Sequence, residues 1–200
     1  YKRLPAASVI TSRGCPFACT FCSGSIFGRT VRRRSPENVL GEISELMGRF
    51  GIREIYFADD CFTLDRERTA ALCNLILGKR LDLTWICSTR VNLVDEPLLR
   101  LMKKAGCVSI AYGVESADEE QLRAMKKGIT LEEAKRVIAL TRRIGMEVRA
   151  SYIFGLPGED RDSLERTLRL ALEINSDFVI FNIATPRPGT ELYDDARARG

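Results

Sequence analysis

Short runs of β-branched and aromatic residues alternate along this chain with longer stretches in which apolar residues recur at helical spacing. This alternation predicts repeated βα units and a parallel sheet. Each unit of this kind takes roughly 30 residues. The pattern predicts six strands, which are Ser8–Thr11, Glu54–Ala58, Leu83–Ser88, Val108–Gly113, Glu147–Phe154 and Phe178–Ile183.

Between these strands, apolar residues fall three or four positions apart, as they do on one face of a helix. Ser35-Pro36 suits a helix start, and Thr130 with Glu133 has the spacing of a capping box. We expect each apolar stripe to pack on the sheet. The stripes are Val39, Leu40, Ile43, Leu46 and Met47; Cys73, Ile76 and Leu77; Ala134, Val137, Ile138, Thr141 and Ile144; and Leu164, Leu168 and Ala171.

The spacing of apolar residues alone is compatible with two α/β folds, an open doubly wound sheet and a partial barrel. Both gather ligands at the carboxyl ends of their parallel strands. The segments at those ends are polar and would share one rim. In chain order they are the loop GCPFACTFCSG, Asp59 with Asp60, Arg90, Glu115 with Ser116, Gly155–Glu159 and Thr185–Gly189.

The composition is that of a globular domain, because 45% of the 200 residues are hydrophobic and 29% are charged. The sequence begins at Tyr1 rather than Met and ends in the helical run ELYDDARARG, so we expect residues 1–200 to be one domain of a longer protein. No apolar run approaches the roughly 20 residues of a membrane helix, and no leader opens the chain. We expect a cytoplasmic protein.

The net charge of +4 is modest, and its dense patch is the run GRTVRRRSP, with Arg29, Arg32, Arg33 and Arg34. A solvated turn ahead of a helix explains this patch better than a nucleic-acid or anion site. Because no aromatic residues interleave the arginines, nucleic-acid binding is not expected.

The chain contains no histidine, which excludes Ser/His/Asp and Cys/His nucleophiles and histidine-ligated zinc within these residues. The odd number of cysteines and their spread argue against a disulfide framework. We expect four of them to be small buried apolar residues: Cys61, Cys73, Cys87 and Cys107.

The other three cysteines, Cys15, Cys19 and Cys22, have CxxxCxxC spacing on one short loop. Thiolates suit iron–sulfur clusters, zinc or copper. Zinc modules usually need a second ligand pair, and the bacterial ferredoxin run has different spacing and a fourth cysteine. The spacing therefore favours a cluster with three cysteine ligands and one iron open to another molecule.

With Phe21 before the third cysteine, the motif resembles that of the radical S-adenosylmethionine (SAM) enzymes, CxxxCx(aromatic)C. The resemblance implies a partial (β/α)6 barrel with outer helices. It also implies that Cys15, Cys19 and Cys22 hold a [4Fe-4S] cluster whose fourth iron binds SAM. In that family, one electron cleaves SAM to methionine and a 5′-deoxyadenosyl radical that abstracts hydrogen from a substrate.

The same resemblance implies a set of SAM-binding residues. Asp59 and Asp60 stand where the family has a Gly-Gly-Glu run at the SAM amino group, although a solvated turn is the alternative. Glu115, in YGVES, matches a position near the ribose, whereas Arg90 and Lys127 match positions near the ribose and carboxylate. Gly155, in FGLPGE, matches the adenine face. The expected cofactor-binding residues are Phe21, Asp59, Asp60, Arg90, Glu115, Lys127, Ser151 and Gly155.

The runs SPENVLGEI, FADDCFTLD and PRPGTELY look most like members that carry an N-terminal cobalamin-binding domain and perform methylations or ring rearrangements. Such a domain and a C-terminal extension would lie outside this segment. The resemblance implies a small-molecule substrate and a reducing partner such as flavodoxin or ferredoxin. Two alternatives are a methylthiotransferase-like enzyme and a non-catalytic iron–sulfur electron-transfer module.

Overall fold

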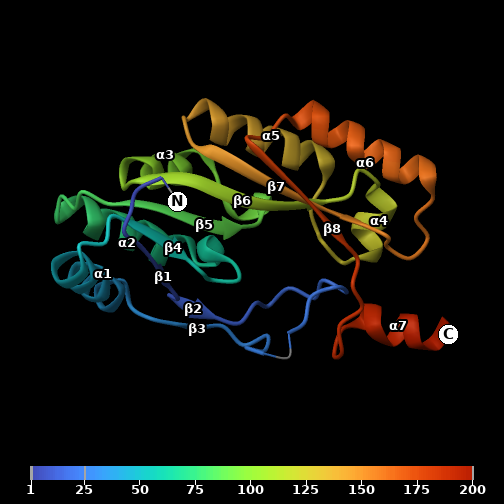
Figure 1. The fold of residues 1–200 in the computed structure, drawn as a ribbon, viewed down its shortest axis with the longest axis horizontal. Coiled ribbons are helices and arrows are strands. Elements are labelled where there is room, and N and C mark those ends of the chain that lie inside the picture. Colours follow the sequence, from blue (N-terminus) through green and yellow to red (C-terminus); the bar gives the residue numbers. More distant parts are fainter. Residues whose placement is uncertain (1, 25, 200) are drawn as a thin grey trace.

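The centre of the fold is a six-stranded parallel sheet whose strands follow one another in chain order, β1-β4-β5-β6-β7-β8 (Figure 1). The computed structural model describes residues 2–24 and 26–199, so the two ends of the predicted domain lie outside the described residues. A doubly wound sheet reverses its strand order at a switch point. The sequential order therefore identifies the partial barrel, as the cysteine motif implied. The strands are β1 (Ala6–Val9), β4 (Glu54–Phe57), β5 (Thr84–Thr89), β6 (Cys107–Glu115), β7 (Glu147–Phe154) and β8 (Phe178–Ile183).

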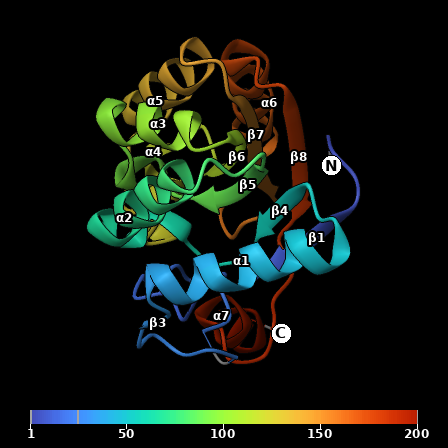
Figure 2. The same cartoon turned by 90° about the vertical axis from the view of Figure 1, so that its left-hand side faces the viewer.

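Helices α1, α2, α3, α5 and α6 form a layer outside the sheet, with α1 in contact with α2, α2 with α3, α3 with α5 and α5 with α6, whereas α7 lies apart from this layer (Figure 2). The predicted caps are confirmed, because the Ser35 and Thr130 side chains accept from the backbone N–H groups of Asn38 and Glu133. The helices are α1 (Pro36–Phe50), α2 (Arg66–Gly78), α3 (Glu96–Lys104), α4 (Glu119–Ala124), α5 (Leu131–Arg143), α6 (Arg161–Ile174) and α7 (Glu191–Arg199), with 3₁₀ turns at Phe62–Leu64 and Val91–Leu93.

The hydrophobic core lies between the sheet and this helical layer. Trp85 on β5 is fully buried, and its ring packs against those of Phe57 and Phe62 at centroid distances of 5.3 and 5.4 Å. Its indole N–H donates to the Ala105 carbonyl at 2.7 Å, so the polar end of the ring is satisfied. Because alternate residues of a strand face opposite sides, the residues between these core positions face the interior of the barrel.

Several details differ from the sequence-based expectation, and the bounds of β4, β5 and β6 are among them, each by one or two residues at an end. Strand β1 ends at Val9, because Thr11 leaves the strand direction and donates its backbone N–H and its hydroxyl to Asp59. Leu77 and Leu168, which we expected to pack on the sheet, are 37% and 46% exposed. Each directly follows a buried helical residue, Ile76 or Thr167, and so points about 100° away from the core.

A short antiparallel ladder was not predicted. Strand β2 (Ser12–Arg13) pairs with β3 (Arg32–Arg33), which places the arginine-rich run beside the end of β1. Arg34 donates to the Ile10 carbonyl at 3.0 Å and pairs with Glu42 at 2.5 Å. The patch therefore includes a paired, hydrogen-bonded arginine and is more than a solvated turn. Among the described residues, no helix has both the length and the apolar character needed to cross a membrane.

Candidate functional site

The cysteine loop follows β1 at the carboxyl edge of the sheet and is held by backbone bonds to distant segments. Thr20 donates its N–H to the Met125 carbonyl just after α4 and accepts from the N–H of Leu192 in α7, both at 3.1 Å. Gly14 has φ +94°, and a Cβ there would lie 2.4 Å from the Thr30 carbonyl oxygen. Only glycine fits such a position. The loop conformation is therefore set by tertiary contacts on both sides.

The three loop cysteines are free thiols with graded exposure: Cys19 is buried, Cys15 half-buried and Cys22 exposed. The pKa of Cys22 is raised, first by desolvation and then by the negative charges of Cys19, Cys15 and Asp60. Cys15, Cys22 and Asp60 line a cavity of about 100 Å³. Two of the three loop thiols therefore face a common space with the Asp60 carboxylate.

This donor set fits an iron–sulfur cluster better than a single metal ion. Within residues 2–24 and 26–199, no three His, Cys, Asp or Glu side chains are placed to hold one ion. A four-iron cluster makes a different demand, because its thiolates bind separate irons. Cys61 does not complete the set: it is buried, its Sγ lies 3.3 Å from Thr89 Oγ1, and it does not line the cavity. Cys15, Cys19 and Cys22 stay the predicted cluster ligands.

Arg90 lies beneath the cysteine loop. Its Nη1 is 3.5 Å from Cys19 Sγ, and its guanidinium carbon is 3.9 Å from the centre of the Phe17 ring. It also donates to the Lys127 carbonyl, and the residue is only 7% exposed. Arg90 thus holds the Cys19 side chain in place from beneath the loop. Direct contact of Arg90 with SAM stays a prediction, whereas its contacts with Cys19 and Phe17 of the loop are formed in the structure.

Glu115 and Lys127 form a buried ion pair at the end of β6, with Glu115 Oε1 2.6 Å from Lys127 Nζ and both side chains 7% exposed. Glu115 has φ 73°, and the β6–β7 register shifts between Gly113 and Glu115. A Cβ at Gly113 would lie 2.1 Å from Glu115 Oε1 and 2.6 Å from Lys127 Nζ. Gly113 is therefore a site residue that the sequence analysis missed, although a glycine inside a strand is the usual signal.

A pocket of about 460 Å³ opens beside this ion pair. It brings together three residues that were predicted to bind SAM, namely Phe21, Glu115 and Ser151. Lys127 adjoins it, because its Nζ is 5.9 Å from the centre of the Phe21 ring. The end of β8 and the segment after it add residues that the predicted SAM-binding set did not include: Asn182, Thr185 and Arg187.

The two neighbouring aspartates after β4 are placed differently. Asp59 is buried and accepts three hydrogen bonds, from the Thr11 N–H at 2.6 Å, the Thr11 hydroxyl at 2.5 Å and the Ser12 hydroxyl at 2.6 Å. Asp60 lines the cavity of the cysteine loop. Asp59 thus ties the ends of β1 and β4 together, and Asp60 is the carboxylate that faces the thiols.

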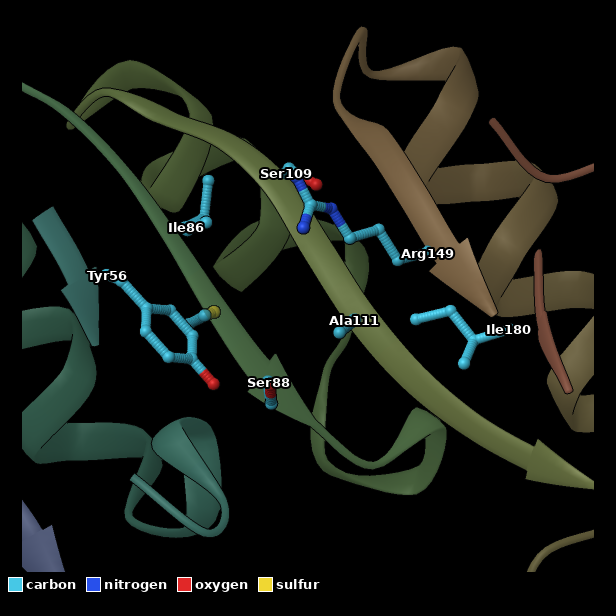
Figure 3. Close-up of a pocket in the computed structure, with 8 residues that line it drawn as sticks. Tyr56, Ile86, Ser88, Ser109, Ala111, Arg149 and Ile180 are labelled. Atoms are coloured by element: carbon cyan, nitrogen blue, oxygen red, sulfur yellow. The ribbon is translucent and has the colours of Figure 1, made fainter. Parts of the chain in front are cut away.

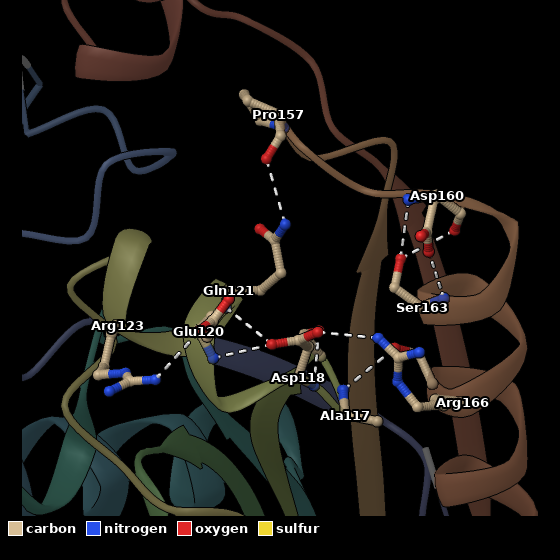
Figure 4. A network of polar contacts seen from close by, with 11 residues as sticks. Ala117, Asp118, Glu120, Gln121, Arg123, Pro157, Asp160, Ser163 and Arg166 are labelled. Carbon is tan, nitrogen blue, oxygen red and sulfur yellow. Dashed lines mark hydrogen bonds and ion pairs between the residues drawn. The ribbon is translucent and has the colours of Figure 1, made fainter.

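Gly155 begins the loop between β7 and α6 with φ 82°. Its N–H donates to Glu159 Oε2 at 2.5 Å, and no protein atom lies within 4 Å of a Cβ added there. Figure 4 shows how this loop is anchored: Gln121 of α4 donates to the Pro157 carbonyl at 3.2 Å, and Arg166 of α6 pairs with Asp118 at 2.9 Å. The loops after β6 and β7 are thereby joined. Contact of Gly155 with a cofactor stays a prediction.

Comparisons with known proteins agree with this geometry. The chain is 40% identical over 196 residues to an uncharacterized methyltransferase of Pyrococcus horikoshii, and the aligned region covers 98% of this chain and 43% of that protein. It is 34% identical over 186 residues to the anaerobic magnesium-protoporphyrin IX monomethyl ester cyclase of Rubrivivax gelatinosus, and that aligned region covers 92% of this chain and 34% of the cyclase. The chain therefore spans less than half the length of either relative.

A solved structure has the same fold. The radical SAM methyltransferase TsrM from Kitasatospora setae, with cobalamin and a [4Fe-4S] cluster bound, matches 97% of this chain and 37% of its own length, with a TM-score of 0.90 and 22% identity. The family model of the radical SAM superfamily matches residues 9–171. The motif, the partial barrel and these matches agree, and the chain belongs to the radical SAM superfamily.

Proposed function

We propose that this chain is the catalytic core of a cobalamin-assisted radical SAM enzyme that methylates or rearranges a small organic substrate. The observation that carries the proposal is the cysteine loop beside a pocket that holds the Glu115–Lys127 pair. The similarity to a methyltransferase and to a cyclase supports both reaction types. A cobalamin-binding domain, a C-terminal extension and a reductant such as flavodoxin or ferredoxin belong to the same proposal.

Cys15, Cys19 and Cys22 would hold the [4Fe-4S] cluster, and Asp60 together with the pocket around Glu115 would hold SAM. When bound, the cluster and SAM supply one-electron reductive cleavage of a carbon–sulfur bond. Arg90 positions Cys19 through its 3.5 Å contact with the sulfur. The protein's part is to orient these groups and to limit the access of water.

The residues of the pocket suggest individual roles. The Glu115 carboxylate can accept hydrogen bonds from ribose hydroxyls, while Lys127 neutralises its charge in this buried place. Asp60 is a better partner for the SAM ammonium than Asp59, because three donors already occupy the oxygens of Asp59. Phe21 and Ser151 line the space between the cysteine loop and β7.

The proposal is tested by anaerobic reconstitution of the full-length protein with iron and sulfide, followed by reduction with dithionite in the presence of SAM. We expect 5′-deoxyadenosine or S-adenosylhomocysteine to form, with adenosine products measured by chromatography. A Cys15→Ala/Cys19→Ala/Cys22→Ala variant is the control. A protein that loads iron but neither binds nor cleaves SAM would support an electron-transfer module instead. Appearance of a thiomethylated product would support a methylthiotransferase.

A further inference from the structure

The inner face of the sheet encloses a second cavity, of about 350 Å³, that shares no lining residue with the pocket at Glu115. Figure 3 shows its walls, which come from five neighbouring strands, β4 to β8. Ile86, Ala111 and Ile180 supply its apolar surface, and Tyr56, Ser88, Ser109 and Arg149 its polar groups. The volume is within the range of small-molecule sites.

Arg149 extends from β7 across the cavity toward Ser109 (Figure 3). Its Nε is buried and has no hydrogen-bond partner. Among the residues that the structure describes, no carboxylate forms an ion pair with this guanidinium, and its recorded contact is with the face of Phe178, 5.0 Å from the ring centre. The residue as a whole is half-buried, so its guanidinium, which carries five donors, has a buried Nε–H free to donate to a ligand.

A second unsatisfied group faces the same space. Ser109 is 1% exposed, and its hydroxyl has no partner among the described residues. Buried polar groups without a protein partner are uncommon, and two of them lining one cavity are both free to bind the same ligand. That ligand would be an acceptor, because Arg149 can only donate hydrogen bonds.

Nothing in the cavity wall offsets the charge of Arg149. No carboxylate lines the cavity. Glu147, two residues earlier on β7, pairs with Lys2 Nζ at 2.5 Å. Glu54, at the start of β4, accepts from the N–H groups of Lys2 and Arg3 and from the Thr84 hydroxyl. The nearby acidic side chains are thus engaged elsewhere, and the cavity is complementary to an anion.

The strand register relates this cavity to the reactive rim. Ala111 pairs with Arg149, and Gly113 pairs with Ser151, one repeat further along the same face. Two residues of a strand span about 6.6 Å. A molecule anchored on Arg149 would therefore point its other end toward Ser151 and the Glu115 pocket.

We propose that Arg149 and Ser109 bind an oxyanion of the substrate, a carboxylate or a phosphate-type group, while Ile86, Ala111 and Ile180 contact its apolar body. This assignment rests on the proposed function, because it places the substrate below the SAM pocket. It defines the substrate class as a small organic acid or phosphoester with an apolar portion. Tyr56 and Ser88 offer two further hydroxyl groups to the same ligand.

The experiment measures anion binding by the reconstituted full-length protein in saturating SAM, with inorganic phosphate in one arm and benzoate in the other. The anion that binds more tightly, phosphate or benzoate, identifies the type of oxyanion. We expect Arg149→Met to weaken that binding at least about tenfold, because hydrogen bonds to charged groups contribute roughly 1.5–3 kcal/mol. Arg149→Lys should be intermediate, because the two-pronged geometry is lost. Arg161→Met, on an exposed part of α6, is the matched control.

Ser109→Ala keeps the test decisive if Arg149→Met fails to fold, and it should weaken binding several-fold. Equal binding by Arg149→Met and the wild type, or no binding of either anion by the wild type, would overturn the assignment. Joint loss of anion and SAM binding in Arg149→Met would also overturn it, because Arg149 would then support the fold as a whole. Absence of SAM cleavage in the wild type would contradict the proposed function alone, since anion binding is measured without turnover.

Discussion

The cysteines of this chain divide between two regions that treat the same side chain in different ways. Cys15, Cys19 and Cys22 lie on one irregular loop, where Cys15 and Cys22 line a cavity and Cys19 contacts Arg90. Cys73, Cys87 and Cys107 are at most 2% exposed, between the sheet and the helices. Burial raises the pKa of Cys73 to about 12. A thiol in the packed layer therefore acts as a small apolar residue, whereas a thiol on the loop is available as a ligand.

Cys61 lies between these extremes and shows what separates them. It is buried at the rim beside the loop, and desolvation is the main reason that its pKa is raised. Its hydrogen bond with Thr89 turns it away from the cavity that Cys15 and Cys22 line. Cys61 is thus engaged with Thr89 and lies outside the CxxxCxxC loop.

Removing the loop thiols should have the largest effect. We expect the Cys15→Ala/Cys19→Ala/Cys22→Ala variant to lose essentially all cluster iron and to keep its circular dichroism spectrum, because the loop lies outside the packed core. Iron is measured colorimetrically after reconstitution. Cys73→Ala is the matched control and should retain wild-type iron. Wild-type iron in the triple variant would contradict the assignment of the cluster.

Next in size is the loss of the rim ion pair. Glu115→Gln leaves the buried Lys127 ammonium without its partner, so the free energy of unfolding should fall by about 3–5 kcal/mol. Urea denaturation of the unreconstituted protein measures this. Glu132→Gln, at an exposed position of α5, should change stability by less than about 0.5 kcal/mol. Equal stability of the two variants would show that the pair is not formed.

Substitution of the two aspartates after β4 should affect different properties, the stability of the fold for Asp59 and SAM binding for Asp60. Asp59→Asn replaces one of the two oxygens that accept three hydrogen bonds with an NH2 donor, and should lower the free energy of unfolding by about 1–3 kcal/mol. Asp60→Asn should leave stability nearly unchanged and weaken SAM binding. Thermal denaturation and equilibrium dialysis with SAM distinguish the two. The reverse pattern would assign the SAM contact to Asp59.

The smallest effect is a pH dependence of the packed layer. The pKa of Cys73 is about 12 in the folded protein against an ordinary value of 9.0, so the folded state binds the proton more tightly. This contribution is fully present below pH 9 and declines between pH 9 and 12, because unfolded thiols ionise first. The slope is at most about 1.4 kcal/mol per pH unit for one thiol. Urea denaturation from pH 7 to 10.5 should give a shallower decline for Cys73→Ala; identical slopes would exclude Cys73 as the cause.

Local patterns in the sequence were sufficient for much of the fold. Residue period and capping signals predicted all six strands of the main sheet, and the bounds of Glu147–Phe154 and Phe178–Ile183 were correct. The cysteine motif likewise predicted the family and the partial barrel. These properties depend on residues close together in the chain, where spacing translates directly into geometry.

Only the tertiary structure decided how the site is assembled. The register shift after Gly113 aims Glu115 at Lys127, and no periodic pattern reports such a shift. Thr11 and Ser12, which lie 48 and 47 positions before Asp59, donate hydrogen bonds to Asp59. These bonds give Asp59 a structural role that Asp60 does not share. Nothing in the run EVRASYIF marks Arg149 as a binding residue, and only the curved sheet places it at a cavity. The sequence alone determined which elements form and which cysteines stand together, because those features are local. Pairing between strands determined which polar groups meet, because such contacts join residues that are distant in the chain.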